Sequence, residues 1–507
     1  MISLKEAKNQ LESKKKSIVI NKEIACDLIT PVQTLLKIKK YFADYHFLYE
    51  SVEKGSSKGR YSVIGLMPDL VFKSEGNLAF INQNLNLGSN EFIKIENPNP
   101  IEALRDLINE SKIELEIKSE VESENSILSS GLFGYMSYDM IRLMEEIPNH
   151  NLEDEINIPD STFIRPQILI VFDNIFDIAT ISSPIYYHEN LNVNLAYEKA
   201  QKNIDYIIDL INQEEVKIQN NTAKDKNKIK YSFSSSKKEY CNMVKKVKNY
   251  IVEGDIFQAL PSLRASADFQ QEDSFALYRS LRSINPSPFL FYLQFPDFSF
   301  MGSSPEIMVS LKNDKVTIRP LAGTRKRGKN EAEDKEIAQD LLLDKKELAE
   351  HLMLIDLGRH DVGRVCQAST VKVTEKMIIE NYSHVMHISS NVQGVIKDDN
   401  DALDALIGGF PAGTVSGAPK IRAMEIIEEI ENKKRSFYAG CVGYFAGNGD
   451  METCITLRSA LIKNNKIYLQ AGAGVVYDSI PEKEYEECQN KLAALISAID
   501  KINKYIN

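Results

Sequence analysis

A strongly polar stretch near the middle of the chain places the tightest limit on how this sequence can fold. Between Gln213 and Lys238 lies a run, residues 219–228, with almost no apolar side chains. Such a run cannot bury enough surface to offset the entropy of ordering it, so we expect a linker or a long surface connection there. The chain has 507 residues, which is too long for one ordinary domain. We therefore predict two regions, 1–230 and 231–507.

Short β-rich runs and amphipathic helical patterns occur on both sides of this stretch. The pattern predicts strands at 47–49, 61–65, 168–172, 289–294, 315–319, 438–445 and 466–470. It predicts helices at 101–113, 195–211, 334–356, 421–430 and 482–499. The last two helices follow Pro419 and Pro481, a residue type that is favoured at helix starts. Because strands and helices do not alternate strictly, we predict a mixed α/β (α+β) fold with largely antiparallel sheets.

Composition excludes several classes of protein. The formal net charge of -11 provides no global positive field, so we expect no nucleic-acid partner and no anionic membrane surface. No apolar run approaches the roughly 20 residues that span a bilayer, and the first residues do not resemble a signal peptide. The six cysteines are scattered without a CxxC pair, which favours reduced thiols over a disulfide framework or a zinc site. These features predict a cytoplasmic protein.

Two predicted helices each carry a pair of glutamates one turn apart. Glu347 and Glu350 share one helix face, and Glu484 and Glu487 share another, with Lys491 four residues further on. Like charges at this spacing repel unless a cation or solvent intervenes. Oxygen ligands of this kind suit Mg²⁺, which binds one or two carboxylates and keeps places for water and an anionic substrate. The spacing alone favours a solvated acidic face over a metal site.

Two glycine-rich segments narrow the choice of ligand. Residues 408–420 run directly into a predicted helix, an arrangement that exposes backbone N–H groups to anions. The segment has neither the spacing of a Walker A loop nor a Gly-x-Ser-x-Gly elbow. Residues 471–476 lack the third glycine of a dinucleotide fingerprint. The two segments indicate a site for a small anion or tight turns, and nucleotide binding fits them poorly.

Several motifs together carry a more specific signal. In chain order they are Pro320-Leu321-Ala322-Gly323-Thr324-Arg325, the helix from Glu347 to Arg359, His384-Val385-Met386-His387, the loop 413–420, and the helix from Glu484 to Lys491. Their order and content resemble the chorismate-utilising enzymes, which include anthranilate, aminodeoxychorismate, isochorismate and salicylate synthases. The resemblance covers about residues 240–499. It implies antiparallel sheets packed as a sandwich with surrounding helices.

The resemblance implies a metal site and a substrate site. Glu350 and Glu487 would hold Mg²⁺, with Glu347 and Glu484 completing the site, and the ion would bind the ring carboxylate of chorismate. Arg458 would hold the enolpyruvyl carboxylate, and the planar guanidinium of arginine matches such a group. The further substrate contacts that it implies are Tyr438, Gly323, Thr414, Gly472, Gly474 and Lys491.

Catalytic roles also follow from the resemblance. Glu306 matches a general acid that protonates the departing 4-hydroxyl, which requires a raised pKa. His387 matches the residue that assists the later loss of pyruvate, and Thr324 belongs to the same group. Gln258 stands where water-adding members carry a lysine base, and an amide cannot deprotonate water. Ala322 stands where many aminodeoxychorismate synthases carry a nucleophilic lysine.

The chain is similar, within this family, to component I of the anthranilate synthases. Phe47-Leu48-Tyr49-Glu50-Ser51 resembles their Leu-Leu-Glu-Ser element, although Tyr49 replaces a leucine. In that family this element and an Asn-Pro-Ser-Pro element form a tryptophan feedback site. The expected tryptophan-binding residues are therefore Glu50, Ser51, Pro286, Ser287, Pro288 and Phe289.

The resemblance implies a reaction and a partner. The expected reaction converts chorismate and ammonia to anthranilate and pyruvate, the first committed step of tryptophan synthesis. No segment resembles a glutaminase, so a separate glutamine amidotransferase subunit would supply the ammonia in a hetero-oligomer. The alternatives are an aminodeoxychorismate synthase, which makes a folate precursor, and a tryptophan-sensing subunit without activity.

Overall fold

The computed structural model describes residues 2–53, 57–85, 91–96, 99–114, 127–213, 215, 229–382 and 385–506. The predicted linker, residues 219–228, lies outside these residues, and the boundary near 230 stays a prediction. In the N-terminal region the strands are β1 (Ile18–Ala25), β2 (His46–Glu53), β3 (Ser57–Glu75), β4 (Leu78–Asn82), β5 (Ile93–Lys94), β6 (Gly131–Met136), β7 (Ser161–Asp173) and β8 (Ile178–Ile185). The helices there are α1 (Leu4–Lys8), α2 (Pro31–Ile38), α3 (Pro100–Glu110), α5 (Ile141–Met144) and α6 (Val193–Gln213).

The C-terminal region contains more strands, and most of them are short. They are β9 (Ser232–Phe233), β10 (Gln258–Ala259), β11 (Ser262–Asp268), β12 (Phe289–Gln294), β13 (Phe298–Ser304), β14 (Ile307–Lys312), β15 (Lys315–Ile318), β16 (Leu321–Lys326), β17 (Lys372–Asn381), β18 (Val385–Val395), β19 (Gly417–Ala418), β20 (Cys441–Ala446), β21 (Met451–Ile455), β22 (Ser459–Lys463) and β23 (Lys466–Gly472). The helices are α7 (Lys237–Glu253), α8 (Ser274–Ile284), α9 (Glu331–Leu343), α10 (Lys345–Val365), α11 (Ala402–Gly409), α12 (Lys420–Ile430) and α13 (Pro481–Asp500).

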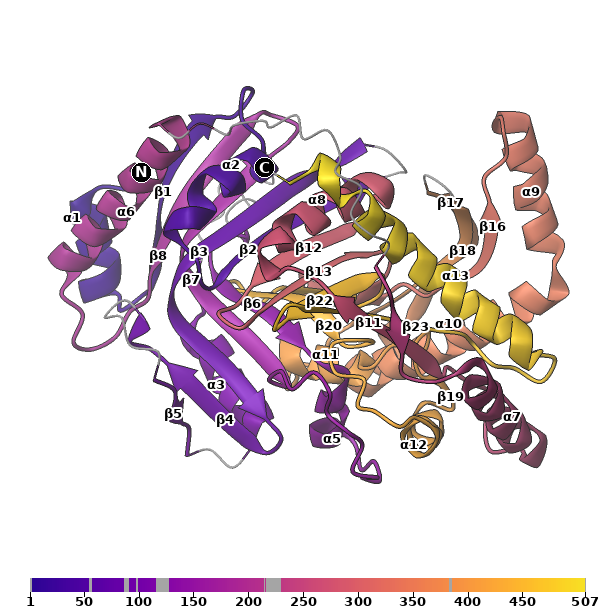
Figure 1. Ribbon diagram of the computed structural model, residues 1–507. Coiled ribbons are helices and arrows are strands. Elements are labelled where there is room, and N and C mark those ends of the chain that lie inside the picture. Colours follow the sequence, from indigo (N-terminus) through magenta and orange to yellow (C-terminus); the bar gives the residue numbers. More distant parts are fainter. Residues whose placement is uncertain are drawn as a thin grey trace.

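One long pair of strands divides the sheet into two layers. β3 and β7 pair antiparallel over nearly their whole length, with a register shift between Pro68 and Leu70 next to the left-handed Met67 (φ 54°). A bulge of this kind bends a strand. On one side of the bend the sheet continues through β2, β12, β13, β22, β23 and β11. On the other side it continues through β6, β20, β21, β14, β15 and β18 (Figure 1).

The alternation of side chains along these strands produces two hydrophobic cores. Phe47 and Val63 point between the two layers, where they join Phe133 and Phe300 in the inner core. The adjacent residues Leu48 and Ile64 point to the opposite face. Helices including α2, α6, α7, α8 and α13 cover that face (Figure 1). The predicted mixed fold, with antiparallel sheets packed as a sandwich and helices around it, is confirmed.

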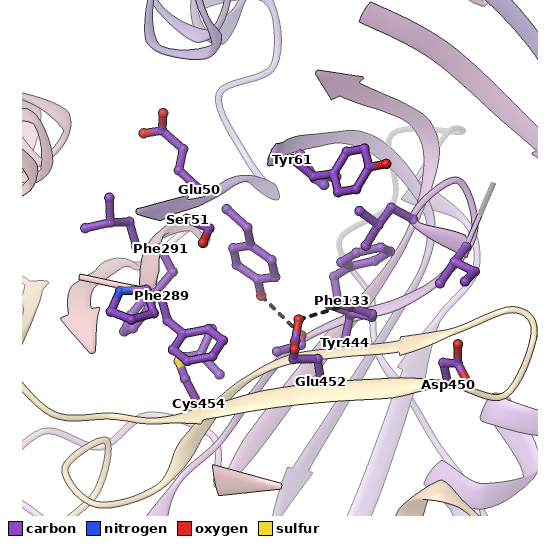
Figure 2. A pocket seen from close by; sticks show the side chains of 18 of the residues that line it. Glu50, Ser51, Tyr61, Phe133, Phe289, Phe291, Tyr444, Asp450, Glu452 and Cys454 are labelled. Carbon is purple, nitrogen blue, oxygen red and sulfur yellow. Dashed lines mark hydrogen bonds between the residues drawn. The ribbon is translucent and has the colours of Figure 1, made fainter. Parts of the chain in front are cut away.

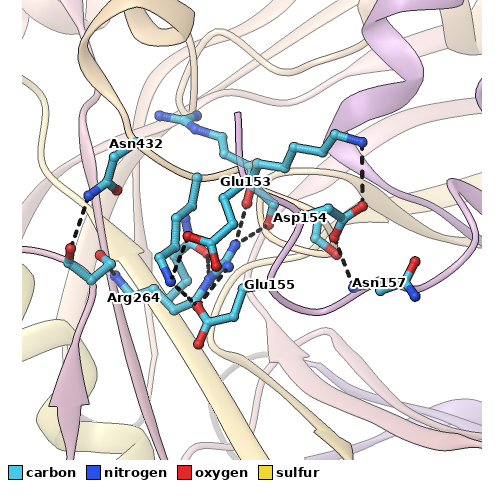
Figure 3. Close-up of polar contacts among 12 residues, drawn as sticks. Glu153, Asp154, Glu155, Asn157, Arg264 and Asn432 are labelled. Carbon is cyan, nitrogen blue, oxygen red and sulfur yellow. Dashed lines mark hydrogen bonds and ion pairs between the residues drawn. The ribbon is translucent and has the colours of Figure 1, made fainter. Parts of the chain in front are cut away.

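The two regions share one sheet. β2 pairs antiparallel with β12, and β6 pairs antiparallel with β20, so C-terminal strands flank the N-terminal strands on both sides. An acidic loop strengthens this junction (Figure 3). Glu155 lies 2.9 Å from Lys433 Nζ and 3.1 Å from Lys466 Nζ, and Asp154 lies 3.4 Å from Lys434 Nζ. The two regions are therefore joined by backbone pairing and by ion pairs.

Most predicted elements occur close to their predicted bounds, but one predicted helix is divided. The helix predicted at 334–356 is in fact two helices, α9 and α10, which meet at Asp344. The side chain of Asp344 accepts hydrogen bonds from the backbone N–H groups of Lys346 and Glu347, so it begins a new helix. All six cysteines are buried and free. Among the described helices, none combines the length and the apolar character that a bilayer crossing requires.

Candidate functional site

The candidate site lies where the chain crosses between the two layers of the sandwich. Glu306 lies on the short link from β13 to β14, and Arg458 lies on the link from β21 to β22. Backbone hydrogen bonds hold the two links side by side. The N–H of Ile455 donates to the carbonyl of Glu306 (3.0 Å), and the N–H of Ser303 donates to the carbonyl of Arg458 (3.1 Å). The topology thus places an acid and a guanidinium in one site.

Glu306 is buried, with 5% of the residue's surface exposed. The Thr414 hydroxyl donates to Oε1 over 3.0 Å, and the N–H of Leu321 donates to the same oxygen over 3.4 Å. Burial raises the pKa of Glu306 to about 8, although these hydrogen bonds and the charge of Arg458 act in the opposite direction. Glu306 is therefore protonated at neutral pH, as a general acid must be. Thr414, predicted to contact the substrate, here contacts the acid.

Arg458 carries a positive charge in this largely enclosed site. Its backbone is left-handed (φ 48°), which turns the chain between β21 and β22. Its Nη1 donates to the side-chain oxygen of Asn285 over 3.4 Å. Burial lowers the pKa of Arg458, whereas the nearby Tyr382 and Glu306 raise it. Arg458 is half-buried, and hydrogen bonding among the described residues engages its guanidinium only weakly, so it is well suited to bind an anion that can form a bidentate pair.

The imidazole of His387 is held at its Nδ1 atom. Its Nδ1 lies 3.2 Å from the carbonyl of Gly323 and 3.1 Å from the hydroxyl of Thr324. A carbonyl only accepts, so Nδ1 carries the proton and donates it to Gly323. Burial first, and the charges of Arg458 and Lys491 next, lower the pKa of His387 to about 4. His387 is therefore neutral, and its Nε2 has a free lone pair that can accept a proton.

A second wall of the site comes from β10, β23 and the residues after them. A Cβ atom added to Gly474 would lie 2.7 Å from the amide nitrogen of Gln258, so glycine leaves room for that side chain. The phenol of Tyr438 shares a hydrogen bond with the backbone of Gly472, and burial raises its pKa. Lys491 Nζ donates to the carbonyl of Gly472 over 2.8 Å. The structure thus brings these four predicted residues together with Lys491.

The four glutamates predicted to bind metal come from α10 and α13. Burial raises the pKa of Glu350 and of Glu484, and repulsion from Glu487 contributes to both shifts. The carboxylates therefore lie close enough to affect one another. Each of three has a cationic neighbour: Glu347 with Arg325 (3.1 Å), Glu350 with Lys346 (3.7 Å) and Glu487 with Lys491 (2.9 Å). In the part of the chain that the structure describes, no three acidic, histidine or cysteine side chains converge closely enough to hold a metal as they stand.

Comparisons with known proteins identify the family. Residues 47–497 match the family described as chorismate binding enzyme. The chain is 46% identical over 483 residues to anthranilate synthase component 1 of Cereibacter sphaeroides, which covers 95% of this chain and 94% of the relative. It is 41% identical to the protein of the same name from Acetivibrio thermocellus, covering 96% and 95%. The chain belongs to the chorismate binding enzymes.

Solved structures agree with this assignment. Anthranilate synthase component I from Streptococcus pneumoniae superposes with a TM-score of 0.74 at 34% identity, covering 93% of this chain and 99% of that one. The isochorismate synthase MenF from Escherichia coli superposes with a TM-score of 0.69, covering 98% of each chain, but at 19% identity it supports the fold alone. The family match begins in β2 and ends in α13, so the strands of both regions belong to one chorismate binding enzyme.

This chorismate binding enzyme has a second cavity, of about 480 Å³, between the two layers (Figure 2). Its lining includes Ser51, Pro288 and Phe289 of the residues predicted to bind tryptophan, and also Glu50. The opposite wall, which the sequence did not reveal, comes largely from β20 and β21 and includes Tyr444, Asp450, Glu452 and Cys454. Lys312 pairs with Glu452 over 3.0 Å at this wall.

The other predicted tryptophan-binding residues lie at the edge of this cavity or beyond it. The carboxylate of Glu50 points away from the cavity, because its strand alternates (Figure 2). It accepts hydrogen bonds from Tyr278 (2.7 Å) and Arg282 (3.0 Å). Ser287 is buried, and its hydroxyl has no hydrogen-bond partner among the described residues. Pro286 is half-buried and does not line the cavity.

Two residues of the enzyme's site were not assigned from the sequence. Asn285 contacts Arg458, although the sequence assigned no role to it beyond its place in the Asn-Pro-Ser-Pro motif. The ring of Tyr382 lies 5.4 Å from that of His387 at 70°. The one signal in the sequence that could have found Tyr382 was its position five residues before His387. The antiparallel pairing of β17 and β18 brings residues at such a short separation close together. His384, in the same motif, lies outside the described residues.

Proposed function

We propose that this protein is component I of an anthranilate synthase, which converts chorismate and ammonia to anthranilate and pyruvate. Two observations on the site support this reaction. A buried acid, Glu306, is protonated at neutral pH, and a buried base, His387, is neutral and has one free nitrogen. The observation that carries the proposal is the buried Glu306 carboxyl, which lies near Arg458 and accepts from Thr414 and Leu321, since a leaving hydroxyl requires a proton donor that water cannot match.

In the first step, ammonia adds to C2 of the chorismate ring as the 4-hydroxyl leaves. The electrons of the ring shift toward C4, and Glu306 transfers its proton to the departing oxygen, which leaves as water. Arg458 lies in the same site, so its positive charge stabilises the carboxylate that forms on Glu306. The hydroxyl of Thr414 and the N–H of Leu321 donate to that carboxylate as well.

In the second step, pyruvate leaves and the ring becomes aromatic. The Nε2 of His387 accepts the proton from C2, the C–H electrons enter the ring, and the C–O bond to the enolpyruvyl group breaks. The released enolpyruvate gains a proton and becomes pyruvate. The carbonyl of Gly323 holds the opposite nitrogen of His387, which keeps Nε2 available for this transfer.

To bind the substrate, the site must neutralise the negative charges of its two carboxylates. We assign the enolpyruvyl carboxylate to Arg458 and Tyr438. We assign the ring carboxylate to Mg²⁺ held by Glu350 and Glu487, with Glu347 and Glu484 beside them. Hard oxygen donors fit this ion. Burial, and to a smaller extent repulsion from neighbouring glutamates, raises the pKa of Glu350 and Glu484, and a bound cation would stabilise their charged forms. When bound, Mg²⁺ supplies positive charge that neutralises the ring carboxylate.

Two positions separate this reaction from those of other family members. Gln258 occupies the wall beside Gly474, and an amide cannot act as the base that activates water. Ala322, on β16, pairs with Ile388 next to His387, so no lysine nucleophile is present at that position. Ammonia is therefore the nucleophile that we propose. An aminodeoxychorismate synthase would share the substrate-binding residues but stop before pyruvate is lost.

Regulation and assembly form part of the same proposal. We propose that tryptophan binds in the cavity of about 480 Å³ as a feedback inhibitor, with its ring against Phe289 and Tyr444. We also propose that a glutamine amidotransferase subunit supplies ammonia in a cytoplasmic hetero-oligomer. The names of the relatives, which are component 1 of a synthase, support a second component.

The test compares two nitrogen sources with the purified chain, chorismate and Mg²⁺. We expect ammonium to support formation of anthranilate, and glutamine to support it only after the amidotransferase subunit is added. Activity with glutamine alone would contradict the division of labour between two subunits. Consumption of chorismate without any nitrogen source would indicate water as the nucleophile and would overturn the proposal.

A further inference from the structure

Tyr382 stands beside the groups that carry the proposed chemistry, yet none of the assigned roles includes it. The residue directly follows β17, and its ring meets that of His387 edge to face, at 5.4 Å and 70°. Its phenol also lies close enough to Arg458 and Glu306 to interact with both electrostatically: Tyr382 raises the pKa of Arg458, and Glu306 raises the pKa of Tyr382. No other aromatic ring among the described residues contacts His387.

Several contacts fix Tyr382 in place. The phenol donates a hydrogen bond of 2.9 Å to Glu380, which itself forms an ion pair with Arg319. The backbone N–H of Tyr382 donates to Val385 over 2.8 Å, and its carbonyl accepts from Arg327 Nη1 over 2.6 Å. Burial raises the pKa of the phenol, and Glu380 raises it further, so the phenol stays protonated and remains a donor. Both ends of the residue are therefore anchored.

The imidazole of His387 needs this anchor because its other contacts lie on one side. Gly323 and Thr324 both contact Nδ1, and two contacts at one atom permit the ring to tilt about that atom. The edge-to-face contact with Tyr382 restricts such a tilt. We propose that Tyr382 is a positioning residue that aims Nε2 of His387 at the C2 proton. This inference rests on the proposed function.

The two steps of the reaction make this proposal testable. Ammonia addition and loss of the 4-hydroxyl depend on Glu306, whereas loss of pyruvate depends on His387. A tilted imidazole would leave the first step intact and slow the second, in which the C2–H and C–O bonds break. The non-aromatic amino intermediate, which still carries its enolpyruvyl group, would then accumulate and escape from the site. A displacement of about 1 Å can cost up to roughly 100-fold in such a step.

The experiment compares Tyr382→Leu, Tyr382→Phe and the wild-type chain with ammonium, chorismate and Mg²⁺. For Tyr382→Leu we expect consumption of chorismate within about threefold of wild type, a fall of roughly tenfold or more in pyruvate formation, and release of the intermediate. Tyr382→Phe keeps the ring but loses the phenol's hydrogen bond to Glu380, so it should restore most of the pyruvate formation and release only a small amount of the intermediate. Tyr206→Leu is the matched control. Tyr206 lies on the distant helix α6 and makes a similar edge contact with Phe42.

Equal losses of chorismate consumption and pyruvate formation in Tyr382→Leu, without released intermediate, would overturn the proposal. If that variant does not fold, Glu380→Ala tests the same point, since it frees the phenol and leaves the ring present. We expect Glu380→Ala to release a smaller but measurable amount of intermediate, and no release would also overturn the proposal. The wild-type reaction separates the two claims: if wild type forms no pyruvate, the proposed function fails whatever Tyr382 does.

Discussion

Replacing Glu306 with glutamine removes the acidic proton of the site but keeps the size and hydrogen bonding of the side chain. The amide oxygen can accept from the Thr414 hydroxyl and from the N–H of Leu321, as the carboxyl does now. A general acid typically contributes 10²- to 10⁴-fold to rate. We therefore expect kcat to fall by at least about 100-fold in Glu306→Gln, and we expect the folded protein to become more stable.

The gain in stability follows from the pKa of Glu306. Folding raises this pKa from 4.5 to about 8, so between these values the folded protein keeps a proton that the unfolded chain has lost. The free energy of unfolding of the wild type therefore decreases as pH rises through this window, by about 1.4 kcal/mol per pH unit. Near pH 7 the decrease amounts to about 3 kcal/mol relative to pH values below 4.5. A glutamine does not ionise and escapes this loss.

Denaturant unfolding at several pH values from about 5 to about 7 measures the effect. The difference in free energy of unfolding between Glu306→Gln and wild type should grow steadily with pH, in favour of the variant. Glu23→Gln, which changes an exposed carboxylate on β1, should show no such growth. A difference that stays constant over this range would refute the reasoning, because it would mean that Glu306 ionises normally in the folded protein.

Three other changes probe separate parts of the account. Glu350→Gln should reduce Mg²⁺-dependent turnover to background while tryptophan binding, measured by calorimetry, is unchanged. Tyr444→Ala removes an aromatic wall of the cavity and should weaken tryptophan binding by about tenfold or more without loss of ammonia-dependent activity. Because the chain contains no tryptophan, the fluorescence of the bound ligand reports binding directly. Arg435→Met leaves the buried Glu431 without its ion-pair partner at 2.8 Å and should lower the free energy of unfolding by about 3–5 kcal/mol, measured in denaturant.

Local signals in the sequence predicted many of the elements. Pro481 begins α13 and Pro419 precedes α12, as expected from the restricted backbone of proline. The strand predicted at 438–445 begins later, at Cys441, because Ala439 is left-handed (φ 64°) and interrupts the extended chain. Periodicity could not reveal that break, just as it could not reveal the capping role of Asp344. Both features depend on backbone conformation and side-chain partners rather than on hydrophobic pattern.

Long-range pairing was beyond the reach of any local signal. β2 pairs with β12 and β6 with β20, and each pair joins strands from opposite sides of the polar stretch. Motifs identified residues that line one wall of the cavity of about 480 Å³, but its other wall comes largely from β20 and β21, which carry no motif. The raised pKa of Glu306 was likewise an expectation until burial was known. Features that depend on tertiary packing can be predicted from a single sequence only through its resemblance to a known family.

The products formed from chorismate test the central claim most directly. The purified chain would be incubated with chorismate, Mg²⁺ and ¹⁵N-labelled ammonium, and the mixture followed by NMR. The account predicts ¹⁵N-labelled anthranilate and an equal amount of pyruvate. A labelled aminodeoxychorismate without pyruvate would contradict it, and would show that the alanine at position 322 does not exclude that chemistry.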